Sequence, residues 1–139
     1  MHEPMQFRDR SRSIRVLLAG VIPAAIGALA GILLGVSSGA YWAIGAVAVI
    51  GSILAGFEHE DGWSAADRGL AAGAVYGAAL LIAHAIAGTH AKVSLGGFPP
   101  LLIVITAIAG MLLCAIGGCV GRVRREHSGV PPAEHETGD

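Results

Sequence analysis

The densest group of chemically active side chains in this sequence is the acidic run Glu58, His59, Glu60 and Asp61. Imidazole nitrogens and carboxylate oxygens bind zinc and related metals, and groups of carboxylates bind harder cations. Four consecutive residues do not converge on one ion without unusual backbone curvature, and no second histidine or cysteine stands at a metal-ligand spacing from them. We therefore expect a solvated acidic turn, with a metal site or a membrane-embedded enzyme centre as the alternative.

Three further polar side chains, His84, Tyr76 and Thr106, lie inside long apolar stretches. Ionisable groups within a membrane span are functional candidates, because the hydrocarbon region makes them costly. His84 is predicted about one turn from the outer end of its span, where a hydrogen bond across helices contributes about 0.6 kcal/mol. We expect His84 to be such a contact, with a proton-sensitive or ligand-binding site as the alternative, and Tyr76 to be a packing residue.

Acidic and basic side chains are absent from the middle of every predicted span. Ion-coupled transporters usually need such a charge, despite a cost of about 2.5–3.5 kcal/mol on insertion scales. Their absence disfavours an ion-coupled carrier and leaves open a passive pore or a carrier of neutral solutes. The sequence also contains no phosphate-binding glycine loop and no recognisable nucleophile–histidine–carboxylate motif. A protein without enzymatic activity or a cofactor is therefore expected.

Four long, uncharged apolar stretches must position these side chains. About 18 such residues in a helix cross a hydrocarbon core of ~30 Å. Only 14% of the residues are charged, against a norm near 25% in soluble domains. The first stretch is longer than the core of a cleavable signal, so it is interpreted as a retained span rather than as a leader. The predicted spans cover residues 16–36, 40–57, 65–88 and 98–121.

The predicted fold class is all-α: a polytopic membrane protein with four transmembrane helices in two hairpins. Its transmembrane domain covers residues 15–126. A polar cytoplasmic segment, residues 1–14, precedes this domain. Residues 127–139 are rich in Pro, Gly and Glu, which predicts a disordered cytoplasmic tail.

The basic residues are concentrated at the two ends of the apolar region. Lys and Arg beside a span favour the cytoplasmic side, so both termini are predicted to be cytoplasmic, in a multi-pass protein of the cell's inner or plasma membrane. The clusters are too small for a nucleic-acid-binding face, and the lipid bilayer is the expected partner. The end clusters are Arg8, Arg10, Arg12 and Arg15, then Arg122, Arg124 and Arg125, with only Arg68 and Lys92 between these two clusters.

Glycines recur every fourth residue in two of the spans, and a third span has two glycines eight residues apart with Cys114 between them. Small residues at this spacing line one helix face and permit the close approach on which helix association in lipid depends. The pattern predicts glycine-rich, zipper-like packing, within one chain or between copies in a homo-oligomer. The glycines concerned are Gly27, Gly31 and Gly35, then Gly69, Gly73 and Gly77, then Gly110 and Gly118.

The leading functional expectation is a small integral membrane protein without a catalytic site. It would act as an accessory or self-assembling membrane component, bound to copies of itself or to another membrane protein. The first alternative is a small channel or permease for a neutral solute or an ion, formed by an oligomer. The second alternative is a membrane-embedded metal-binding protein or enzyme that uses the acidic run.

Overall fold

The computed structural model describes Ile14, residues 20–57 and residues 62–127 of the 139-residue chain. Within these ranges the regular structure is helical, which confirms the predicted all-α class. The long helices are α2 (Ile22–Val36), α3 (Ser38–Phe57), α4 (Gly62–Ala87) and α5 (Leu101–His127). Among the described residues, α3, α4 and α5 are long and apolar enough to cross a membrane, whereas α2 has 15 residues. These three helices support a membrane protein.

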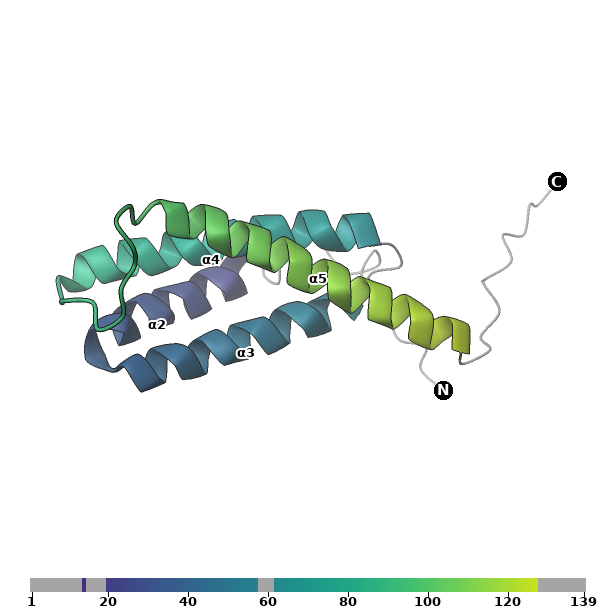
Figure 1. Ribbon diagram of the computed structural model, residues 1–139, viewed down its shortest axis with the longest axis horizontal. Coiled ribbons are helices and arrows are strands. Elements are labelled where there is room, and N and C mark those ends of the chain that lie inside the picture. Colours follow the sequence, from purple (N-terminus) through teal and green to yellow (C-terminus); the bar gives the residue numbers. More distant parts are fainter. Residues whose placement is uncertain (1–13, 15–19, 58–61, 128–139) are drawn as a thin grey trace.

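The four helices lie lengthwise beside one another. The connection from α2 to α3 and the connection from α4 to α5 lie at the same end of the bundle (Figure 1). The most extensive packing joins α4 to α5, followed by α2 to α4 and α3 to α5. Consecutive helices α2 and α3 pack together less extensively, and α3 barely contacts α4. Each helix of the first pair therefore lies beside its counterpart in the second pair.

The side chains are distributed as expected for a protein surrounded by lipid. Large apolar side chains such as Trp42 (65% exposed) and Ile50 (58% exposed) face outward along the helices. The buried positions are mostly glycine or alanine. Among the described residues, the largest fully buried side chains are Leu34 and Leu80. Soluble monomers seldom expose so much contiguous apolar surface. The bulky residues therefore form the outer surface, and the small residues form the helix contacts.

A single residue, Ser37, separates α2 from α3. It has an extended backbone (φ −154°, ψ 128°), and its N–H donates to the Leu33 carbonyl at 2.9 Å. Its own carbonyl accepts from the N–H of Tyr41 at 3.0 Å, in the first turn of α3. One non-helical residue thus ends one helix and begins the next.

The second connection, residues 88–100, folds back over the end of α2. Gly88 follows α4 with a φ of 61°, a left-handed conformation that favours glycine at a helix end. The N–H of Lys92 donates to the Leu34 carbonyl at 3.0 Å, and Val93 packs against the small core around Leu34. The connection is therefore attached to α2 by a backbone hydrogen bond and by apolar contact.

At the start of α5, Pro99 and Pro100 form the first turn without donating hydrogen bonds. Their carbonyls accept from Leu102 and Ile103 at 2.9 and 3.1 Å. A proline is tolerated at this position because the first N–H groups of a helix have no partner inside it.

Close backbone approach characterises the contact of α2 with α4. A Cβ atom built on Gly27 would collide with the Tyr76 carbonyl oxygen, and one on Gly31 would collide with the Leu80 carbonyl oxygen. Gly35 lies against the side chain of Thr89 in the following connection. The contacting residue numbers increase together along α2 and α4, so the two helices run in the same direction.

The contact of α4 with α5 is equally close but antiparallel. A Cβ on Gly69 would collide with the Gly110 carbonyl oxygen, and one on Gly73 with the Thr106 carbonyl oxygen. Along α3 and α5, a Cβ on Gly117 would meet the Ile53 carbonyl oxygen. At each of these positions, a side chain larger than hydrogen requires the helices to move apart.

Candidate functional site

The acidic run predicted as a metal site, Glu58 to Asp61, lies outside the described residues, so its metal-binding role stays a prediction. Within the ranges that the structure covers, no group of three or more His, Cys, Asp or Glu side chains could hold a metal ion. The polar groups that can be located lie inside the bundle and at its two ends.

His84 lies in the last turn of α4, on the same face as the buried Leu80. Its Nδ1 atom is buried and has no hydrogen-bond partner among the described residues. The predicted hydrogen bond across helices is therefore not seen at that atom. His84 follows Gly77 by seven residues, or about 10 Å along the helix. Because Thr106 packs against Gly77, the structure separates His84 from the other predicted polar residues.

Thr106 and Tyr76, by contrast, line one cavity. The Thr106 hydroxyl donates to backbone carbonyls of its own helix, with Oγ1 2.9 Å from the Leu102 oxygen and 3.1 Å from the Ile103 oxygen. Such a bond satisfies a hydroxyl in lipid without a second helix. Thr106 therefore needs no partner across the bundle.

The cavity has a volume of about 500 Å³ and takes residues from all four helices. Most of its lining is aliphatic, as in sites for small apolar molecules, which typically range from about 300 to 1,000 Å³. It extends along α4 from Arg68 to Tyr76, a distance of roughly 12 Å for eight residues. Tyr41 of α3 also contributes to the lining.

Arg68 is the functional candidate that the sequence does not reveal. It precedes the uncharged stretch that begins at Gly69, which suggests a flanking residue. However, α4 begins at Gly62, so Arg68 lies six residues, or about 9 Å, inside the helix. It lines the cavity, and its guanidinium Nη1 is buried. Arg68 also makes an interaction within the protein.

A small polar relay links α5 to α3 beside the cavity. The Cys114 thiol donates to the Ser52 carbonyl at 3.2 Å, and the Ser52 hydroxyl donates to the Ala48 carbonyl at 2.8 Å. Cys114 is buried, whereas Cys119 is exposed, and both are free thiols. Of these two hydrogen bonds, the one from Cys114 joins α5 to α3, and the one from Ser52 lies within α3.

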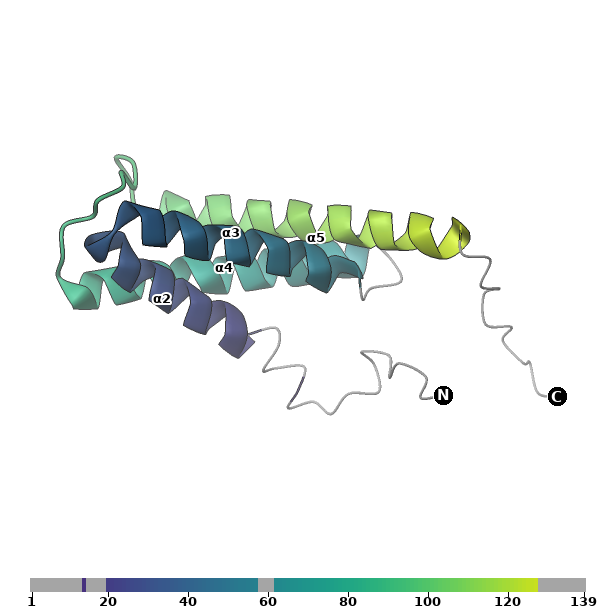
Figure 2. The ribbon, with the colours of Figure 1, turned by 90° about the horizontal axis from the view of Figure 1, so that it is seen from below.

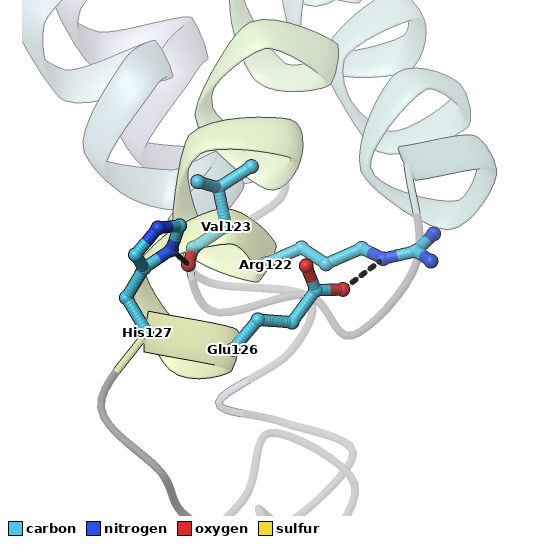
Figure 3. A network of polar contacts seen from close by, with 4 residues as sticks. All are labelled: Arg122, Val123, Glu126 and His127. Carbon is cyan, nitrogen blue, oxygen red and sulfur yellow. Dashed lines mark hydrogen bonds and ion pairs between the residues drawn. The ribbon is translucent and has the colours of Figure 1, made fainter.

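The basic end of α5 extends beyond the other helices (Figures 1 and 3). Arg122 Nε lies 3.0 Å from Glu126 Oε1 one turn later, with both side chains exposed, and His127 Nδ1 lies 2.9 Å from the Val123 carbonyl (Figure 3). Arg125 Nη1 donates to the Phe57 carbonyl at the end of α3, at 3.1 Å. These basic side chains thus lie on the last turns of α5, and Arg125 joins them to the end of α3.

Comparison with known proteins adds no further indication. No protein-family model, no curated protein and no solved structure matches this chain. The function is therefore inferred from the protein's own structure, in which the cavity and Arg68 are the most informative features.

Proposed function

We propose that this chain is a non-enzymatic, four-span component of the cell's inner or plasma membrane that associates laterally with copies of itself or with another membrane protein. The observation that carries the proposal is the inverted distribution of side chains. Bulky apolar residues such as Trp42 and Ile50 cover the outside, whereas small residues fill the helix contacts. A soluble domain would bury such bulky residues, since their transfer from water drives folding.

Glycine-rich packing is the proposed source of stability in lipid. Lipid tails are as apolar as leucine, so helix association depends on close contact rather than on transfer from water. The carbonyl contacts of Gly27, Gly31, Gly69 and Gly73 support this role. Because these glycines face helices of the same chain, the proposed lateral association uses the bulky outer surface instead.

For orientation, we propose that both termini are cytoplasmic and that the short α2 is part of a full span, residues 16–36. The basic residues at the end of α5 support this topology, because Lys and Arg beside a span remain on the cytoplasmic side. Ser94, in the connection between α4 and α5, would then face outward, and Glu126 would face the cytoplasm.

Cysteine accessibility tests this topology in the full chain. A background with Cys114→Ala and Cys119→Ala carries either Ser94→Cys or Glu126→Cys, both at exposed positions. A membrane-impermeant maleimide should label the Ser94→Cys protein in intact cells and the Glu126→Cys protein only after permeabilisation. The reverse pattern would invert the topology, and recovery of the chain in the soluble fraction would refute the membrane assignment.

The lateral association has its own test. Chemical crosslinking in the membrane, followed by purification in mild detergent, should recover a stable partner or a homo-oligomer. A chain that remains a monomer without any partner under both conditions contradicts the accessory role.

A small permease is the second candidate, and the cavity among the four helices favours it. Solute flux into reconstituted vesicles that is lost when the cavity is filled would support this function over the accessory role. The predicted enzyme or metal-binding role of the acidic run from Glu58 to Asp61 stays the third proposal, tested by His59→Ala.

A further inference from the structure

The cavity is open on one side toward the surroundings of the bundle. Its lining includes Ile22, Val47 and Leu54, which are 41%, 54% and 58% exposed. Residues of both α2 and α3 line the opening, and Figure 2 shows the first turns of α2 diverging from α3. If the bundle lies in a bilayer, this opening faces lipid. A molecule dissolved in the membrane can therefore enter the cavity without crossing water.

One end of the cavity carries a positive charge. Arg68 contributes a guanidinium group whose Nη1 is buried. An arginine below the membrane surface is costly, so it is a functional candidate by default. Guanidinium has five N–H donors in a planar fork that matches carboxylate and phosphate oxygens. The guanidinium of Arg68 therefore has the donor geometry that an anionic headgroup needs.

The depth of Arg68 fits the headgroup end of an amphiphile. Arg68 lies about 9 Å inside α4, so in the proposed membrane placement it is near the boundary between headgroups and acyl chains. Beyond it the lining is mostly apolar, with Ala72 and Leu113 among its residues and the Thr106 hydroxyl bonded to its own helix, as far as Tyr76 and Tyr41. The cavity thus presents a cation first and then an apolar length of roughly 12 Å.

We propose that this cavity binds an anionic amphiphile from the membrane, with its carboxylate or phosphate on Arg68 and its hydrocarbon part extending toward Tyr76. A fatty acid and an anionic phospholipid share this chemistry. The inference rests on the membrane placement given under Proposed function, but it requires neither lateral association nor transport.

Binding is measured on the full chain, purified in mild non-ionic detergent, from the rise in melting temperature as amphiphile is added. The probes are oleate, oleyl alcohol, dioleoyl phosphatidylglycerol and dioleoyl phosphatidylcholine. We expect oleate or phosphatidylglycerol to bind at least tenfold more tightly than its uncharged or zwitterionic counterpart. A preference for oleate identifies a fatty-acid site, and a preference for phosphatidylglycerol identifies a phospholipid site. Equal affinity for charged and uncharged probes would overturn the proposal.

Two variants separate the charge from the space. Arg68→Gln removes the cation and should weaken binding of the anionic probe about tenfold or more, because hydrogen bonds to a charged group are the strong ones. Its control is Arg122→Gln, at the same end of the bundle but exposed, which should bind like the parent protein.

Gly45→Phe fills the cavity instead. Gly45 contributes to the lining, and a Cβ added there meets nothing within 4 Å, so the variant should fold. Gly20→Phe is the matched control, since Gly20 is equally open and does not contribute to the cavity lining. We expect Gly45→Phe to lose binding and Gly20→Phe to retain it. Unchanged binding in both Gly45→Phe and Arg68→Gln would refute the site, even if the protein remains in the membrane fraction with the proposed topology.

Discussion

The face of α4 that packs against α5 and the part of α3 that lines the cavity use glycine in opposite ways. At Gly69 and Gly73 of α4, an added Cβ would collide with backbone atoms of α5. At Gly45 and Gly51 of α3, an added Cβ meets nothing within 4 Å. Glycine therefore permits backbone contact in one region and leaves open space in the other.

Spacing accounts for this difference. Glycines four residues apart are rotated by only about 40° around a helix, so Gly69, Gly73 and Gly77 share one face. Gly45 and Gly51 are six residues apart and rotated by about 240°, so they point to different faces. A spacing of four produces a continuous groove for a neighbouring helix, whereas a spacing of six does not.

The largest expected effect comes from a bulky side chain in the tight region. Gly73→Leu would drive a branched side chain into the Thr106 carbonyl and the Ala107 backbone. Overpacking usually costs about 1–3 kcal/mol, and backbone atoms yield less readily than side chains, so we expect about 3 kcal/mol or more. Titration of the detergent-solubilised protein with SDS, followed by tryptophan fluorescence, measures the free energy of unfolding.

The same substitution in the open region is the control. Gly51→Leu has the same added volume, a helical position and no atom within 4 Å of its Cβ. Its unfolding free energy should remain within about 0.5 kcal/mol of the parent value. If both variants lost the same stability, close backbone contact would not be what distinguishes the two regions.

The sequence predicts the helices and their close contacts, but not which helices make them. The apolar stretches predict the helices, because long uncharged segments leave few other structures in lipid. The spacing of glycines by four residues predicts that one face of the helix approaches a neighbour closely. It does not identify the neighbour. The similar triplets of α2 and α4 do not face each other, since Gly27 and Gly31 meet α4 whereas Gly73 meets α5.

Arg68 and the cavity are the parts that the sequence leaves undetected. A charge three residues from the start of a predicted span resembles an interfacial anchor, whereas the start of α4 at Gly62 places Arg68 six residues inside the helix. The cavity depends on how α2 and α3 diverge, which is a property of helix pairing rather than of any local pattern. His84 was detectable as an isolated ionisable residue, but it does not contribute to the cavity lining.

A smaller effect is expected for leucine truncation. Leu80 of α4 is fully buried against Ala30 and Leu34 of α2, whereas Leu54 of α3 is 58% exposed at the open side of the cavity. Leu→Ala in a soluble core costs about 2–5 kcal/mol, which combines transfer from water with the cavity left behind. In lipid the transfer contribution is small, so Leu80→Ala should cost about 1–2 kcal/mol from lost packing. Leu54→Ala should cost less than about 0.5 kcal/mol in the same SDS titration, because lipid replaces the missing contacts. Equal losses at both positions would show that Leu80 packs no more tightly than a lipid-facing side chain.

The addition of a single methyl group is expected to differ even in sign between the two regions. Gly69→Ala adds one methyl group where the Gly110 carbonyl and the Cys114 Cβ already lie, so it should destabilise the protein by about 1–3 kcal/mol. Gly45→Ala adds the same methyl group in open space. In soluble helices such a change stabilises by about 0.4–1 kcal/mol through the entropy of the unfolded chain. Helices that persist in unfolded membrane proteins reduce this gain, so Gly45→Ala should range from neutral to slightly stabilising. Since both variants have the same composition, a loss at Gly45 equal to that at Gly69 would mean that the open side closes on the methyl group, and therefore that the cavity is filled by protein in the membrane.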